Sequence, residues 1–141
     1  MATKISFINE IAALCEKVGA DVKQVAKGMG MDNRIGSKFL HAGPGYGGSC
    51  FPKDTKALAR IGQENAVAMQ ITETVIKVND EIKRRMIQKL LDLCDGSFKD
   101  KIIAVLGVTF KPNTDDMRDS PSLVIISRLQ AAGATIRAHD P

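Results

Sequence analysis

Residues 66–94 read AVAMQITETVIKVNDEIKRRMIQKLLDLC and carry the longest regular pattern of the chain. Apolar residues recur along it at steps of three and four, at Val67, Ile71, Val75, Val78, Ile82, Met86, Leu90 and Leu93. This spacing predicts a single helix, roughly 40–45 Å long at about 1.5 Å per residue. A second, partial apolar face also needs cover, at Ile76, Ile87, Leu91 and Cys94. We therefore expect the helix to pack against a second copy of the chain as well as its own domain; the alternative is a helix that only bridges two domains.

Two shorter helices are predicted upstream of this one. An apolar stripe over residues 4–18 stops at Gly19, and Cys15 lies within the stripe, so it should be a core residue without chemistry. Asp21 can cap a second helix over residues 22–27. The pair Gly28 and Gly30 should end that helix, because glycine favours breaks.

Residues 31–53 look irregular, and a loop of that length is usually functional or disordered. Its aromatic and apolar side chains indicate an ordered loop, with Phe39 as core support. Asp54 or Thr55 would then cap a helix over residues 56–61.

The pattern changes after Asp95-Gly96-Ser97. Residues 102–106 read Ile-Ile-Ala-Val-Leu, which is typical of a buried parallel strand. A polar loop over 107–119 leads to Ser120 and Pro121, which mark the start of a helix that stops at Gly133, and residues 134–138 predict a second strand. One βαβ unit cannot form a complete doubly wound sheet. The predicted fold class is therefore mainly α with a partial α/β unit: a helical domain with one long helix over 1–95, then an incomplete βαβ unit over 96–141 that looks cut off inside a domain.

Composition describes an ordinary globular protein, with 44% hydrophobic and 26% charged residues. No apolar run is long enough to cross a bilayer and the first residues lack a signal-peptide pattern, so we expect a cytoplasmic protein without a membrane partner. Three cysteines without a CxxC pair indicate reduced thiols. Because the chain has only two histidines, no metal site is expected.

The net charge of +4 has its densest cluster on the long helix, at Lys83, Arg84, Arg85 and Lys89. The chain has five Phe, one Tyr and no Trp, and none of them interleaves with this cluster. A solvated helix face is therefore favoured over a nucleic-acid surface, and no nucleic-acid partner is expected.

The strongest chemical signal lies in residues 43–54, which read Gly-Pro-Gly-Tyr-Gly-Gly-Ser-Cys-Phe-Pro-Lys-Asp. Glycines at this density allow positive φ and let backbone N–H groups face an anionic ligand. Lys53 is close enough to Cys50 to favour a thiolate, and Asp54 could order a water or relay a proton. The segment indicates covalent chemistry on a phosphate-bearing substrate; the alternative is a simple turn beside a small buried cysteine.

This segment resembles the active-site loop of the UDP-glucose/GDP-mannose dehydrogenase family. The resemblance extends to Gly-Met-Asp-Asn-Arg-Ile-Gly at 30–36, Lys-Phe-Leu-His at 38–41 and Gly-Val-Thr-Phe-Lys-Pro-Asn-Thr-Asp-Asp-Met-Arg-Asp-Ser-Pro at 107–121, and so covers nearly the whole chain. It implies the family's central helical domain, followed by the first βαβ of its UDP-binding, Rossmann-like domain. The GxGxxG fingerprint of the family's NAD-binding domain is absent here.

The resemblance also implies roles for individual residues. Cys50 matches the nucleophile of a two-step, NAD-dependent oxidation of UDP-glucose to UDP-glucuronate through a thiohemiacetal and a thioester, and Asp54 matches the residue that places the hydrolytic water. Lys53 and Arg118 match residues that approach NAD, Arg118 from a neighbouring subunit. The segment that embraces UDP-glucose corresponds to His41, Ala42, Gly43, Pro44, Gly45, Tyr46 and Gly47.

Three further implications concern the substrate and the assembly. Phe110 and Lys111 match a substrate-contacting pair from the UDP-binding domain. Arg34 resembles an arginine that reaches the partner subunit's substrate, so a homodimer or higher homo-oligomer is expected. Many family members carry lysine where His41 stands, and a neutral imidazole would hold a diphosphate less firmly.

Several alternatives remain open at this point. The family's catalytic lysine and its companion asparagine would lie upstream of Ala2, and Lys4 matches a later position, so the isolated chain is predicted to be inactive. Ser49 and the surrounding motifs favour UDP-glucose over N-acetylated UDP sugars, while GDP-mannose remains the closest alternative. A non-catalytic oligomerisation module is a second possibility. A Cys–His hydrolase, with His41 or His139 as the base, is a third, although neither spacing supports it.

Overall fold

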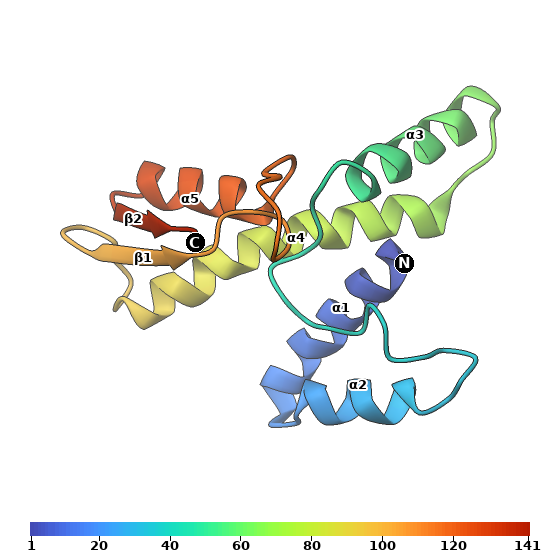
Figure 1. Cartoon of the computed structure of the whole chain (residues 1–141), viewed down its shortest axis with the longest axis horizontal. Helices are drawn as coiled ribbons and strands as arrows, with labels where there is room; N and C mark the ends of the chain where they lie inside the picture. Colours follow the sequence, from blue (N-terminus) through green and yellow to red (C-terminus); the bar gives the residue numbers. More distant parts are fainter.

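The structure, a computed structural model, describes all 141 residues. It is mainly helical with a small parallel sheet, as the sequence predicts (Figure 1). In chain order, its elements are α1 (Ala2–Val18), α2 (Val22–Gly30), α3 (Phe51–Glu64), α4 (Gln70–Leu93), β1 (Ile102–Leu106), α5 (Pro121–Ala131) and β2 (Thr135–His139).

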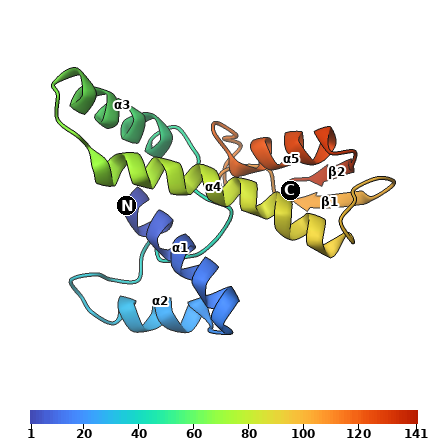
Figure 2. The ribbon, with the colours of Figure 1, turned by 180° about the vertical axis from the view of Figure 1, so that it is seen from behind.

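Helix α4 forms the central axis of the molecule. Figures 1 and 2 show α3 running alongside its N-terminal half, α1 and α2 on the other side, and the βαβ unit at its C-terminal half. The 24 residues of α4 correspond to roughly 36 Å, which is shorter than expected. Residues 66–69 belong instead to the turn from α3, because Ala66 has a φ of 54° and the Val67 N–H bonds to the carbonyl of Gly62. Val67 continued the apolar pattern in the sequence, yet it is 56% exposed in this turn.

Two helix boundaries predicted in the N-terminal part are confirmed, and the predicted end of α2 is wrong. Helix α1 ends at Gly19 with φ 74°, and Asp21 caps α2 by accepting a hydrogen bond from the Lys23 N–H at 2.8 Å. However, α2 does not break at Gly28 but continues to Gly30. A single glycine inside a helix costs only about 1 kcal/mol, so it weakens a helix without ending it.

Helix α3 begins five residues earlier than predicted, at Phe51 instead of Lys56, and Cys50 occupies its N-cap position. Pro52 lies in the first turn, where its missing N–H has no cost. Thr55 does not cap the helix, since its hydroxyl donates to the carbonyl of Phe51 at 2.7 Å.

Two small apolar clusters hold the chain together. One joins α1, the loop and α4 through Ala2, Tyr46 and Val75. The other joins the end of α4 to the βαβ unit through Phe98, Leu129 and Ala134, against which several half-buried side chains of α4 pack: Ile87, Leu90, Leu91 and Cys94. The C-terminal part of the second apolar face of α4 is therefore partly covered by its own chain, while Ile71 and Leu93 of the same helix stay 73% and 80% exposed.

Strands β1 and β2 are parallel, with Ile102 opposite Thr135 and Leu106 opposite His139. The prediction of a strand buried on both faces is wrong for β1. Its residues alternate between half-buried and exposed, and Ile102 and Leu106 are 61% and 82% exposed. Only one face of the strand pair packs on α4 and α5.

The cationic cluster on α4 is only in part the solvated face that the sequence indicated, since Arg84 and Lys89 are exposed. Lys83 is buried and lies 3.6 Å from Asp80, while Arg85 and Lys89 both pair with Glu16 of α1 at 2.5 and 2.6 Å. These charges tether α1 to α4. No helix of the chain combines the length and apolar character that a membrane span requires. Cys15 is buried, as predicted.

Candidate functional site

The loop over residues 31–50 has no regular secondary structure and is fixed by side chains of the neighbouring helices. The Lys4 ammonium donates to the carbonyls of Ile35 and Gly36, both at 2.9 Å. The side-chain oxygen of Asn9, also on α1, accepts a hydrogen bond from the Gly43 N–H at 2.8 Å. Helix α1 therefore holds both ends of the segment that leads to the glycines.

Asn79 of α4 holds the centre of the glycine-rich segment. Its Oδ1 accepts a hydrogen bond from the Tyr46 N–H at 2.7 Å, and its Nδ2 donates to the Tyr46 carbonyl at 3.2 Å. Asn79 and Tyr46 are both buried, so these bonds satisfy backbone groups that water cannot reach. Gly45 has a φ of 108°, and a Cβ there would lie 2.7 Å from the Asn79 Oδ1. Only glycine fits this position.

The next two glycines receive the loop that follows β1. The Gly48 N–H donates to the carbonyl of Arg118 at 2.8 Å. A Cβ on Gly47 would collide with the Asp119 carbonyl, and one on Gly48 would lie 2.7 Å from the Phe110 ring. The glycines therefore permit a close backbone contact between the helical part of the chain and residues 107–120.

A cavity of about 430 Å³ opens where these segments meet. It brings together several predicted substrate residues with others from α1 and the loop: Ile5, Lys38, Phe39, His41, Gly45, Tyr46, Gly47, Phe51, Phe110 and Lys111. Phe51 packs edge-on against Tyr46 and tilted against Phe39, with ring centroids 6.0 Å apart in each pair. Phe39 thus supports the loop, as expected.

The cavity combines an aromatic wall with three side chains that can bind an anion: Lys38, His41 and Lys111. The Lys111 ammonium lies 5.2 Å from the centre of the Phe110 ring, which orients it by a cation–π contact. Burial raises the pKa of the Tyr46 phenol, which therefore stays a neutral hydroxyl. This arrangement suits a ligand with a flat or apolar part and a negatively charged part. Lys38 was missed as a site residue, although it opens the Lys-Phe-Leu-His motif.

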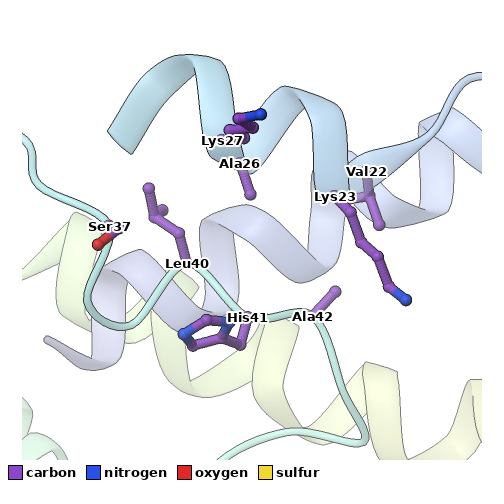
Figure 3. A pocket seen from close by; sticks show the side chains of 8 residues that line it. All are labelled: Val22, Lys23, Ala26, Lys27, Ser37, Leu40, His41 and Ala42. Atoms are coloured by element: carbon purple, nitrogen blue, oxygen red, sulfur yellow. The ribbon is translucent and has the colours of Figure 1, made fainter. Parts of the chain in front are cut away.

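Figure 3 shows a second cavity, of about 420 Å³, between α2 and the loop. Leu40 points from the loop toward α2, and the His41 ring lies on the loop side of the cavity. His41 therefore borders both cavities, whereas Ala42 lines this one and the space beside α1 but not the first cavity. Gly43 and Pro44 also face α1. The structure thus brings His41, Gly45, Tyr46, Gly47, Phe110 and Lys111 together but leaves Ala42, Gly43 and Pro44 outside the cavity.

Cys50 lies at the rim of the site. It is exposed, and its Sγ lies 3.7 Å from the Ser49 hydroxyl. Its neighbour Phe51 lines the cavity. Asp54 follows one helical turn after Cys50 on the same face of α3, and its carboxylate pairs with the Lys53 ammonium at 3.3 Å. Both side chains of this pair are mostly exposed, so the pair contributes little to stability.

Arg118 reaches this rim within the same chain. Its backbone carbonyl binds Gly48, as described above, and its guanidinium pairs with Asp116 at 2.7 Å. The hydrogen bond from Arg118 to Asp116 holds the pKa of Arg118 above its usual value, and Cys50 is close enough to add a smaller contribution in the same direction. The Arg118 backbone therefore lies beside the loop that carries Cys50 of the same chain. Arg34 lines none of these cavities and is 89% exposed.

A glycine-rich loop that ends in an exposed cysteine, beside a cavity with aromatic and cationic walls, defines the site. The chain belongs to the UDP-glucose/GDP-mannose dehydrogenase family. The family's central domain matches residues 1–81, and its UDP binding domain matches residues 104–141.

Individual proteins of the family are highly similar to this chain. The UDP-glucose 6-dehydrogenase of Rhizobium meliloti is 58% identical over all 141 residues, and YwqF of Bacillus subtilis, a protein of the same name, is 57% identical. The chain covers 32% of each. It therefore spans about a third of the length of these curated relatives.

Solved structures agree with this assignment. A UDP-glucose dehydrogenase from Pyrobaculum islandicum superimposes with a TM-score of 0.94 at 42% identity, covering 99% of this chain and 32% of that one. A GDP-mannose dehydrogenase from Pseudomonas aeruginosa reaches a TM-score of 0.62 at 29% identity, covering 94% of this chain and 30% of that one.

Proposed function

We propose that the chain forms the central part of an NAD-dependent UDP-glucose 6-dehydrogenase. The observation that carries the proposal is the cavity of about 430 Å³ whose aromatic and cationic walls end at the loop bearing Cys50. The higher identity to UDP-glucose enzymes than to the GDP-mannose enzyme favours UDP-glucose as the substrate. We divide the chain into a helical domain over 1–95 and a UDP-binding unit over 96–141.

In this proposal the cavity binds UDP-glucose. The diphosphate would lie near Lys38, His41 and Lys111, and the apolar faces of the ligand would pack against Tyr46 and Phe110. Lysine and imidazolium groups attract a diphosphate, while neutral imidazole can only donate one hydrogen bond. As a neutral imidazole, His41 would hold the diphosphate less firmly than a lysine would. Ala42, Gly43 and Pro44 would act through the shape of the loop.

Cys50 would carry the covalent step. The C6 alcohol first loses a proton and a hydride and becomes an aldehyde. The Cys50 sulfur then bonds to the aldehyde carbon and gives a thiohemiacetal, whose loss of a hydroxyl proton and a second hydride leaves a thioester. Water, placed by Asp54, attacks the thioester carbon, breaks the C–S bond and releases the carboxylate and the free thiol.

Each of the two oxidations would need its own molecule of NAD as hydride acceptor, two for each UDP-glucose. Lys53 and Arg118 suit a cofactor that carries a diphosphate, because both side chains are exposed cations near Cys50. Lys53 follows Cys50 by three residues, and the backbone carbonyl of Arg118 accepts a hydrogen bond from Gly48 of the same loop. No glycine-rich dinucleotide fingerprint is present in the sequence, so these residues alone would not hold NAD. We infer that the isolated chain does not oxidise UDP-glucose. We further infer that the protein acts in the cytoplasm as a homodimer or higher homo-oligomer, in which Arg34 reaches the substrate site of the neighbouring subunit.

The NADH yield per UDP-glucose, measured with the protein in its full natural length, tests this proposal. Two NADH per sugar should form, and Cys50→Ser should abolish the second oxidation. Cys94→Ser is the matched control, because Cys94 packs in the second apolar cluster and should leave the yield at two. Turnover with GDP-mannose but not with UDP-glucose would mean that GDP-mannose is the substrate and that the proposed cysteine mechanism still holds. No turnover with either sugar would contradict the enzyme and favour an oligomerisation module.

A further inference from the structure

Two arginines of this chain are held by the same local device. In each case an aspartate two residues earlier accepts the arginine's backbone N–H at 2.9 Å and then binds its guanidinium. Arg34 donates from Nε at 3.0 Å and from Nη2 at 2.5 Å to Asp32. Arg118 donates from Nε at 2.9 Å and from Nη2 at 2.7 Å to Asp116. The repeat within one chain shows that an Asp-x-Arg segment can fix a guanidinium without help from another element.

This pairing leaves one edge of each guanidinium free. The carboxylate occupies the Nε edge, whereas Nη1 has no hydrogen-bond partner in the chain. The Arg118 side chain is 71% exposed, so the free edge faces solvent beside the loop of Cys50. An arginine edge with two parallel N–H groups matches a phosphate or carboxylate, and fixing it beforehand lowers the entropy lost on binding.

Asp116 is itself anchored more firmly than Asp32. Its side chain is 16% exposed, against 35% for Asp32. Its N–H donates to the Thr114 hydroxyl at 3.2 Å and its carbonyl accepts from the Phe110 N–H at 3.1 Å. The residue that holds Arg118 is therefore bound to the turn that places Phe110 and Lys111 in the cavity.

We propose that Asp116 is a positioning residue that fixes Arg118 as a preformed receptor for a diphosphate beside Cys50. The identity of that diphosphate, from NAD or from the nucleotide sugar, rests on the proposed function. Asp116 touches neither ligand in this proposal. It acts only by holding the guanidinium plane in one orientation.

Asp116→Asn tests the proposal because two effects have opposite signs. Removing a negative charge beside an anion site should tighten anion binding if only charge matters. Positioning predicts the reverse, since the amide cannot hold the guanidinium with two charge-assisted bonds. Asn still accepts the Arg118 backbone N–H through its side-chain oxygen, so the turn should fold, and an unchanged melting temperature checks this.

The expected result is a rise of about five-fold in the KM for one of the two ligands, with kcat changed less than two-fold. A rise for NAD assigns the diphosphate to the cofactor, and a rise for UDP-glucose assigns it to the substrate. Asp115→Asn is the matched control, because it removes the same charge one residue away and Asp115 makes no bond to Arg118. In an Arg118→Lys background, Asp116→Asn should have no further effect on KM.

An unchanged or lower KM in Asp116→Asn would overturn the proposal, as would an equal rise in Asp115→Asn. If the protein turns over no nucleotide sugar, the proposed function fails but the inference is still decided. Calorimetric binding of inorganic pyrophosphate to the protein should then weaken in Asp116→Asn and not in Asp115→Asn. Equal binding by the two variants and the parent would contradict the positioning role.

Discussion

The loop over residues 31–50 and the strand pair β1–β2 differ in an instructive way. The loop is irregular, yet its centre is buried at Leu40, Tyr46, Gly47 and Gly48. The strands are regular, yet Ile102 and Leu106 are 61% and 82% exposed. In the loop, side chains of α1 and α4 bind the backbone, whereas in the strands the backbone groups bind one another. The comparison shows that regular secondary structure does not measure how firmly the rest of the chain fixes a segment.

Leu129→Ala should have the largest effect and should separate the two regions. Leu129 is fully buried between α4, α5 and the strands, so the substitution leaves a cavity and costs about 4 kcal/mol. Hydrogen exchange should become fast in β1 and β2, while the Gly43 and Tyr46 amides keep their protection. Leu123→Ala, at a side chain 41% exposed on the same helix, should cost far less. Equal loss of protection in both regions would mean that they unfold as one unit.

Asn79→Ala should have the next largest effect, now on the loop. It leaves the buried N–H and carbonyl of Tyr46 without partners, which costs about 3 kcal/mol. The free energy of unfolding from urea titration checks the magnitude, and exchange at the Tyr46 amide checks the place. Asn65→Ala removes one exposed hydrogen bond at the end of α3 and should cost much less. If the two variants lose the same stability, the loop is not held by Asn79.

Gly47→Ala tests the contact between the loop and the βαβ unit. The added methyl group would meet backbone atoms of Asp119 and Ser120, which cannot move as a side chain can, so we expect a loss of about 2 kcal/mol. Gly43→Ala is the matched control, since nothing lies within 4 Å of a Cβ there. Thermal unfolding measures both. A loss as large in Gly43→Ala would indicate a general cost of replacing loop glycines.

Glu16→Gln should have the smallest effect, and that effect should depend on pH. The hydrogen bond from Lys89, with the charge of Arg85, holds the pKa of Glu16 below its ordinary value of 4.5. The ion pairs of Glu16 with Lys89 and Arg85 therefore stabilise the fold above about pH 4.5. Their contribution to the free energy of unfolding is lost as the pH falls through the lowered pKa of Glu16. Because both partners are partly exposed, we expect about 0.5 kcal/mol near neutral pH. Urea unfolding at several pH values checks it; a difference that grows toward low pH would contradict the sign.

The sequence predicted the order of helices and strands, because helical and strand periodicities differ and Gly19, Asp21 and Gly133 mark boundaries. It misplaced the starts of α3 and α4. Cys50 could be a loop residue or a helix N-cap, and Val67 could continue the helical stripe or lie in a turn, and only the tertiary contacts decide between these. It also predicted that β1 is buried on both faces. An apolar run shows that a strand is suited to burial, but it does not show which elements cover each face. Six of the predicted substrate residues meet in one cavity.

The bonds that hold the site could not be predicted. Asn9 and Asn79 look like ordinary polar helix residues, and only the fold brings them to Gly43 and Tyr46. Lys83 looked solvated because a pattern of charges says nothing about which face a neighbouring helix covers. The Asp-x-Arg pairs are local and were visible in the sequence, but Arg118 near Cys50 depends on the contact of Gly47 and Gly48 with residues 118–120.

Cysteine alkylation followed by peptide mass spectrometry, with and without UDP-glucose, tests whether the cavity beside Cys50 is the substrate site. Cys50 of this chain is exposed, Cys94 is half-buried and Cys15 is buried. We expect Cys50 to react fastest, and we expect UDP-glucose to protect it while leaving Cys94 unchanged. If Cys94 reacts as fast as Cys50, or if UDP-glucose protects neither, the cavity beside the glycine-rich loop is not the substrate site.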